Sequence, residues 1–151
     1  MKAARTAARH RSRRAALQAL YASDLRARGS APPEAPEAAL DALAEHFELP
    51  PGARAFAKEL VLGVAAEREA LDARLRAVAR NWRLERMALV DRNLLRLAAF
   101  EILSLGTPPA VAIDEAVELA HEFGDDASPR FVNGVLDALV RAAGGETEGE
   151  A

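Results

Sequence analysis

The spacing of apolar residues constrains the fold of this chain more than any other feature of its sequence. Between residues 53 and 80, for example, Phe56, Leu60 and Val64 recur every four positions. A period near 3.6 residues places such side chains on one face of an α-helix. The same period predicts helices over residues 11–28, 36–47, 53–80, 90–105, 111–123 and 128–143, with a short helical turn at 84–87.

Composition agrees with this interpretation. Aromatic residues make up only 5% of the chain, and runs of β-branched residues, which favour strands, are absent. The dominant residues, alanine, leucine, arginine and glutamate, favour helices. We therefore expect an all-α protein of about seven helices, and 151 residues suffice for one domain or for two small bundles that share a core.

Several helix boundaries carry local signals. Gly106 follows an apolar segment and precedes two prolines, which predicts a left-handed helix cap. Ser128 and Pro129 predict the N-cap and the first position of the last helix. Within that helix, Gly134 predicts a point of close contact with another helix. The second helix is expected to include Phe47, whose ring continues its apolar stripe.

Charge is distributed unevenly along the chain. Residues 1–28 contain eight basic residues and one acidic residue, a balance of +7, although the whole chain carries -3. The remaining residues therefore carry a net charge of about -10. A basic segment on an acidic body is typical of proteins that bind polyanions such as nucleic acids. A solvated basic tail is the alternative.

Other classes of function have little support. The chain has no cysteine, which excludes disulfides and thiolate metal sites and agrees with a reducing cytoplasm. It has no run of about 18 apolar residues and no signal peptide, so no membrane association is expected. His10, His46 and His121 lack the spacing of a metal site, and no catalytic or phosphate-binding motif occurs. Neither a metal, a cofactor nor an enzymatic activity is expected.

The first helix combines the basic residues with the only tyrosine. Projected at about 100° per residue, Arg11, Arg14 and Gln18 form one stripe, and Tyr21 lies about 20° from Arg14. Arginine planes and aromatic rings together bind unpaired RNA bases and their phosphates. The stripe therefore predicts an RNA-binding surface. The alternative is that Tyr21 is a core aromatic whose hydroxyl reaches the surface.

Five stretches of the chain, in this order, resemble the NusB family of bacterial transcription antitermination factors: "RSRRAALQALYASDL", "FAKELVLGV", "NWRLERMALVDRNLLRLAAFEIL", "PPAVAIDEAVELAHEFG" and "SPRFVNGVLDAL". The resemblance covers most of residues 9–140, and the Pro-rich stretches "RARGSAPPEAP" and "LPPGAR" depart from the family pattern. It implies an all-α fold of two small helical bundles packed together, without catalytic activity. It also implies binding to boxA, a short single-stranded RNA element of ribosomal RNA operons. The partner in this binding would be a small-subunit ribosomal protein, also called NusE, within a complex of Nus factors that makes RNA polymerase resist termination.

The resemblance further implies which residues bind the RNA and the protein partner. The RNA-binding positions would be Arg5, Arg9, Arg11, Arg13, Arg14, Gln18 and Tyr21 near the N-terminus, with Arg130 and Phe131 at the start of the last helix. The surface for the ribosomal protein would carry Asp91, Glu101, Glu115 and Glu118. Acidic residues suit a basic partner. Glu101 could instead form an internal ion pair with Arg96.

The expected domain organisation is a flexible basic arm over 1–10, one helical domain over 11–143 with bundles at about 11–80 and 81–143, and a disordered acidic tail over 144–151. Two other functions stay open. NusB-like modules also form the RNA-binding part of some RNA cytosine methyltransferases, which would require a catalytic domain that this sequence lacks. A helical scaffold that binds only protein would leave the arginines as a solubility device. The sequence does not decide between a monomer and a homodimer.

Overall fold

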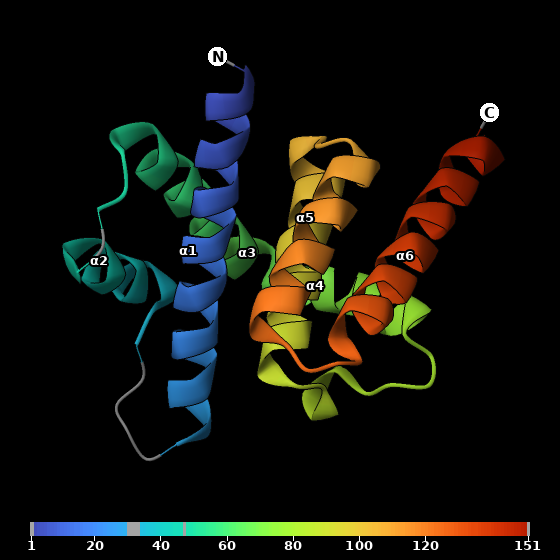
Figure 1. Cartoon of the computed structure of the whole chain (residues 1–151). Coiled ribbons are helices and arrows are strands. Elements are labelled where there is room, and N and C mark those ends of the chain that lie inside the picture. The colour runs from blue at the N-terminus through green and yellow to red at the C-terminus, as the bar shows by residue number, and fades with distance from the viewer. Residues whose placement is uncertain (1, 30–33, 47, 151) are drawn as a thin grey trace. The chain divides into compact units, whose positions relative to one another are not determined.

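The structure is a computed structural model that describes residues 2–29, 34–46 and 48–150. The α-helices are α1 (Lys2–Arg28), α2 (Pro36–His46), α3 (Pro51–Val78), α4 (Leu89–Phe100), α5 (Pro109–Phe123) and α6 (Ser128–Glu150) (Figure 1). A 3₁₀ turn, η1 (Leu84–Arg86), precedes α4, and a π-helical turn, η2 (Glu101–Leu105), continues it. No strand occurs in these ranges, so the prediction of an all-α protein with about seven helical segments is confirmed.

None of the helices in the described part of the chain combines the length and the apolar content that crossing a membrane requires. Phe47, which the sequence places on the apolar stripe of the second helix, lies outside the described residues, as does residue 151.

The chain forms two compact units, Met1–Ala66 and Glu67–Ala151. The boundary therefore lies within α3, earlier in the chain than the division expected at about residue 80. The second half of α3 belongs to the later unit because Asp72 pairs with Arg96 of α4. The Arg96 Nε lies 2.8 Å from Asp72 Oδ1, and both side chains are at least nine-tenths buried.

In the first unit, α1 packs against α2 (Figure 1). Leu17 and Leu20 of α1 and Leu40 of α2 are buried, as the helical period predicts. The hydroxyl of Ser12, which is also buried, donates to the carbonyl oxygen of Ala53 over 2.7 Å. A buried hydroxyl needs such a partner, so this bond links α1 to the start of α3.

The arm predicted over residues 1–10 is not a flexible segment where the structure describes it, because α1 is helical from Lys2. This part of the chain is rich in alanine, the residue with the highest helix propensity. Thr6 Oγ1 donates to the carbonyl oxygen of Lys2 within the first turns. A helix that is already anchored by its later turns extends at little cost per residue.

In the second unit, α4 packs against α5 and α6, which also pack against each other (Figure 1). All ten residues from Asp91 to Phe100 are buried, so α4 is the central helix of this unit. Leu119 of α5 and Leu136 and Leu139 of α6 complete the core and are at most 1% exposed. Gly106 adopts φ 70° and ψ 20°, which confirms the predicted left-handed cap after this helix.

The turn between α5 and α6 contains a capping box that the sequence interpretation assigned incorrectly. Asp125 Oδ1 accepts hydrogen bonds from the backbone N–H groups of Ala127 (2.9 Å) and Ser128 (3.1 Å). The Ser128 hydroxyl in return accepts the backbone N–H of Asp125 over 3.0 Å. Asp125 is therefore the capping residue, and Ser128 occupies the third position of the box.

Two predictions about α6 are also wrong. Gly134 is not a point of close helix contact, because a Cβ built there meets nothing within 4 Å. The acidic tail predicted to be disordered from residue 144 is helical as far as Glu150. Propagating an existing helix adds one hydrogen bond for each residue that is ordered.

Candidate nucleic-acid interface

The predicted RNA-binding arginines of α1 lie in two rows, because residues two positions apart on a helix point about 200° apart. One row contains Arg5, Arg9 and Arg13 at intervals of four residues, and the other contains Arg11, Arg14, Gln18 and Tyr21. Intervals of three or four residues bring side chains together along one face. The structure therefore separates the predicted RNA-binding residues of α1 into two groups with different surroundings.

The first row contacts an aromatic ring of α3. The guanidinium carbon of Arg9 lies 3.8 Å from the ring centroid of Phe56, and that of Arg13 lies 5.6 Å from it. Both distances are within the range of a cation–π interaction. Arg13 is only 6% exposed, whereas Arg9 and Arg5 are exposed. Arg13 thus contributes to packing in the first unit and offers little surface to a ligand.

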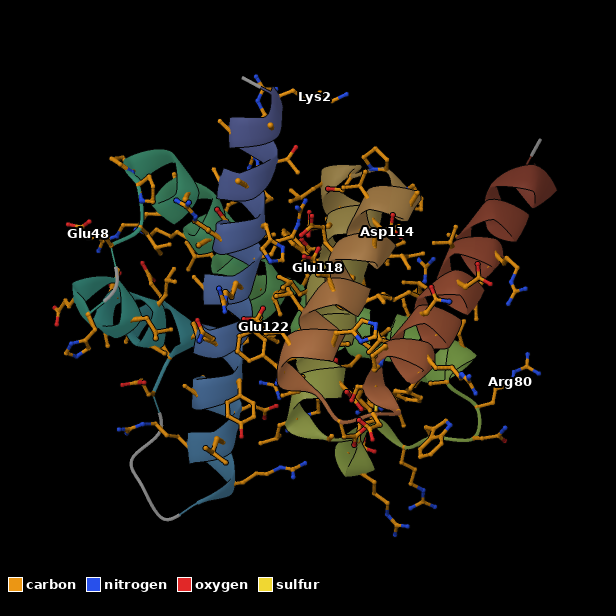
Figure 2. All side chains as sticks on the ribbon, viewed as in Figure 1. Lys2, Glu48, Arg80, Asp114, Glu118 and Glu122 are labelled. Carbon is orange, nitrogen blue, oxygen red and sulfur yellow. The ribbon has the colours of Figure 1, made fainter. Side chains whose placement is uncertain are left out.

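The second row borders a cavity of about 350 Å³ within the first unit. Its lining residues are Arg11, Arg14, Ala15, Gln18, Leu43, Glu48 and Leu49. Arg11 and Arg14 are exposed, and the cavity wall opposite them comes from α2 and from the segment between α2 and α3, where Figure 2 labels Glu48. Two cations, an amide and apolar surface around one hollow match the chemistry of a nucleotide.

Tyr21 follows Gln18 by one turn of the same row and is half-buried, but it does not line the cavity. The sequence interpretation missed Leu43, Glu48 and Leu49. Their only signal is the Pro-rich stretch after α2, whose departure from the family pattern pointed away from a role. Glu48 is an acid among the cations of the cavity, and it would favour ligand groups that donate hydrogen bonds, such as base amino groups.

The second predicted RNA-binding region lies in the second unit. Arg130 is exposed and Phe131 is half-buried at the start of α6. The Phe131 ring contacts the indole of Trp82 edge to face, with centroids 5.1 Å apart and planes at 67°. Both residues line a cavity of about 400 Å³. Trp82 is 60% exposed and was not predicted as a site residue.

The acidic residues predicted to meet a protein partner have unequal access to solvent. Glu118 is exposed on α5, where Figure 2 labels it with Asp114 and Glu122 at intervals of four residues. Glu115 is half-buried. Glu101 is only 1% exposed and accepts a hydrogen bond from the Thr107 hydroxyl. Arg96, the residue considered as an alternative partner of Glu101, binds Asp72 through two guanidinium nitrogens.

Asp91, the fourth of these acids, is 8% exposed in the first turn of α4. Its Oδ1 is buried and has no hydrogen-bond partner among the described residues. Burial raises the pKa of Asp91, a hydrogen bond with Ser128 opposes the rise, and the nearby Asp125 carboxylate adds to it. The ionised form of Asp91 therefore costs stability.

We expect Asp91→Asn to raise the free energy of unfolding at neutral pH by about 0.5 kcal/mol. Because the folded-state pKa is raised, Asp91 favours the folded state below its unfolded pKa of about 4, and this contribution is lost as the pH rises through the folded value. The gain in the variant should disappear at pH 3. Thermal unfolding followed by far-UV circular dichroism measures the stability of the parent and the variant at pH 3 and pH 7. An equal gain in stability at the two pH values would contradict a raised pKa of Asp91.

Comparisons with known proteins all match this chain to one family. The NusB family profile matches residues 10–141. Curated relatives include the transcription antitermination protein NusB of Anaeromyxobacter dehalogenans, 46% identical over 138 residues, which are 89% of this chain and 92% of the relative. That of Sorangium cellulosum is 45% identical over 141 residues, with coverage of 91% and 94%.

Solved structures show the same similarity. NusB from T. maritima superposes with a TM-score of 0.78 at 32% identity and covers 88% of this chain and 90% of its own. A chain in a crystal structure of the antitermination factors NusB and NusE in complex with dsRNA has a TM-score of 0.77 at 28% identity, with coverage of 89% and 97%. On the family match and the identity of its relatives, the chain belongs to the NusB family of transcription antitermination proteins.

Proposed function

We propose that this protein is a cytoplasmic, non-enzymatic antitermination factor that binds single-stranded boxA-type RNA together with the ribosomal protein NusE. The observation that carries the proposal is the cavity beside Arg11, Arg14 and Gln18. It joins exposed cations to apolar surface in a family whose curated members are named transcription antitermination proteins. The other Nus factors and RNA polymerase would be bound within the same complex.

The two rows of arginines in α1 have different roles in the proposed RNA binding. Arg11 and Arg14 supply phosphate contacts at the cavity, and Tyr21 supplies a half-buried ring one turn further along the same face. Arg9 is exposed above Phe56, so it offers its outer side to a phosphate while the ring holds its guanidinium in place. Arg5 extends the positive row toward the N-terminus. The limits of the functional domain, predicted as 11–143, stay a prediction.

The proposed partner surface in the second unit consists of Glu118, Glu115 and the small exposed part of Asp91. A basic ribosomal protein suits these acids, and a cation of the partner that reached Asp91 Oδ1 would satisfy a buried oxygen that lacks a hydrogen bond among the described residues. Glu101 is left out of the surface because it is buried.

The test is a fluorescence anisotropy titration of labelled boxA-type single strand, with a scrambled strand and a boxA duplex as controls. The titration is repeated with purified NusE. We expect preference for the boxA single strand and tighter binding with NusE present. Equal affinity for all three RNAs would reject sequence recognition, and binding to NusE without any binding to RNA would favour the protein-only scaffold.

Arg14→Ala should weaken boxA binding and lower the slope of log K against log salt by about 0.7, the contribution of one phosphate contact to a single strand. Arg13→Ala is the matched control, because Arg13 is next to Arg14 in the sequence but its guanidinium is buried beside Phe56. It should leave the salt slope unchanged and lower the melting temperature instead. The measurement is anisotropy between 50 and 200 mM salt, and an equal loss of slope in both variants would contradict the division into two rows.

A further inference from the structure

Trp82 is a large aromatic residue on the surface of the second unit. It lies between α3 and η1 and is 60% exposed, the largest exposed fraction among the exposed large hydrophobic residues of the described chain. Its backbone is held in a tight turn, because its N–H donates to the carbonyl oxygen of Ala79 over 3.1 Å.

The indole is supported without being covered. Phe131 of α6 contacts it edge to face at 5.1 Å, an arrangement that restrains an aromatic ring and adds a favourable interaction beyond area burial. More than half of the Trp82 surface nevertheless stays open to solvent. The pair therefore presents a restrained aromatic surface to a ligand.

A cavity of about 400 Å³ adjoins this surface, and its lining residues are Val78, Ala79, Arg80, Asn81, Trp82, Arg130, Phe131, Gly134 and Val135. Gly134 explains part of the space, because a side chain built at this position would meet nothing within 4 Å. The glycine that the sequence suggested as a packing contact instead leaves room beside the aromatic pair. This volume is within the range of small-ligand sites.

The charge around the cavity selects the ligand. Its lining includes two exposed arginines, Arg80 and Arg130, and the amide of Asn81, but no acidic residue. Figure 2 shows Arg80 pointing away from the ribbon. Aromatic surface, cations and an amide together match an unpaired nucleotide, whose base stacks while its phosphates are neutralised. An acidic peptide would use the arginines but would leave the flat aromatic surface without a matching group.

We propose that Trp82 stacks one unpaired base of the bound RNA, with Arg80 and Arg130 at the flanking phosphates and Asn81 at the base edge. This proposal rests on the proposed RNA-binding function, and it assigns the second unit a nucleotide subsite of its own. Trp82 would contribute affinity through its π-face and only a modest preference among bases, because stacking tolerates every base.

Trp82 is the only tryptophan of the chain, so the protein carries its own reporter. Intrinsic fluorescence of the full chain is followed during titration with unlabelled boxA-type RNA, and anisotropy of the labelled strand is measured in parallel. We expect the indole emission to be quenched, with saturation at the same RNA concentration as the anisotropy. A Trp82→Leu sample, which has no tryptophan, supplies the background.

Variants test the same subsite independently. Trp82→Leu should weaken binding about tenfold to a hundredfold, and Trp82→Phe should recover most of the loss because a ring remains. Gly134→Leu should weaken binding by filling the cavity while leaving Trp82 in place. Val111→Ala, which changes another exposed apolar residue of this unit, is the matched control and should bind RNA normally. Circular dichroism checks that each variant is folded.

The outcomes separate this proposal from the proposed function. If RNA binds by anisotropy but the indole emission stays constant and Trp82→Leu binds normally, the stacking subsite is rejected and RNA binding stands. If no RNA binds, both are rejected. If NusE alone quenches the indole and RNA adds nothing, the surface docks protein and the subsite is again rejected. A variant that does not fold leaves the quenching of the unmodified protein as the deciding measurement.

Discussion

Asp72→Ala is expected to lower the free energy of unfolding by about 3 to 5 kcal/mol, because it leaves the Arg96 guanidinium buried without its carboxylate. Arg96 binds Asp72 through Nε at 2.8 Å and through its second terminal nitrogen at 3.1 Å, whereas its contact with Asn93 Oδ1 is longer, at 3.4 Å. A bidentate pair of this kind has fixed geometry, so the alanine variant cannot replace it by a small shift. Urea unfolding followed by far-UV circular dichroism measures the loss.

Two further variants test whether the loss of stability comes from the burial of the ion pair and not from the loss of any ion pair. The exposed pair of Asp137 and Arg141, separated by 3.3 Å along α6, is the control, and Asp137→Ala should change stability by no more than about 0.5 kcal/mol. Replacing both buried partners, as Asp72→Leu with Arg96→Met, should recover much of the loss, since apolar side chains of similar size avoid the unpaired charge. A small effect of Asp72→Ala would mean that water reaches Arg96 easily.

Gly124→Ala is expected to destabilise the second unit by about 1 to 3 kcal/mol through overpacking. A Cβ at this position would lie 2.5 Å from Ser128 Cβ and Oγ and 2.8 Å from the carbonyl oxygen of Ala120. The φ of Gly124 is -92°, so the cost comes from space and not from backbone conformation. Relief requires Ser128 to move, which would also disrupt its hydrogen bond with the Asp125 N–H in the capping box.

Gly134→Ala is the matched control, because the same chemical change occurs where no atom lies within 4 Å. An alanine in a helix interior is more favourable than a glycine by about 0.5 to 1 kcal/mol, so this variant should be more stable. The two melting temperatures should therefore shift in opposite directions. A shift of the same sign in both would show that the close approach at Gly124 relaxes without cost.

Local signals in the sequence predicted much of the secondary structure. The apolar period placed α2 to α5 and the start of α6 within a few residues of their observed positions. Gly106 was identified as a left-handed cap because only glycine adopts that conformation without strain. The choice between Asp125 and Ser128 as the capping residue was wrong, because both side chains are good caps and their reciprocal hydrogen bonds depend on the path of the turn.

The sequence predicted the part of the candidate site that lies on one helix. It did not predict the part that depends on contacts between two segments. Helical geometry alone places Arg11, Arg14 and Gln18 on one face of α1. No periodicity in α1 shows that Arg13 meets Phe56, or that Leu49 closes a cavity beside Arg14. Trp82 also carries no periodic signal, because it is a single aromatic residue between helices.

From the sequence we could predict most of the helical segments, the apolar faces of these helices and the concentration of positive charge on α1. These properties follow from backbone geometry and residue chemistry within one or two turns. The tertiary structure alone decided which arginine is buried, that Asp72 pairs with Arg96, and that Gly134 opens a hollow beside Trp82 and Phe131. A period of 3.6 residues specifies which side chains share a face, but the segment that covers that face is selected by packing between residues far apart in the chain.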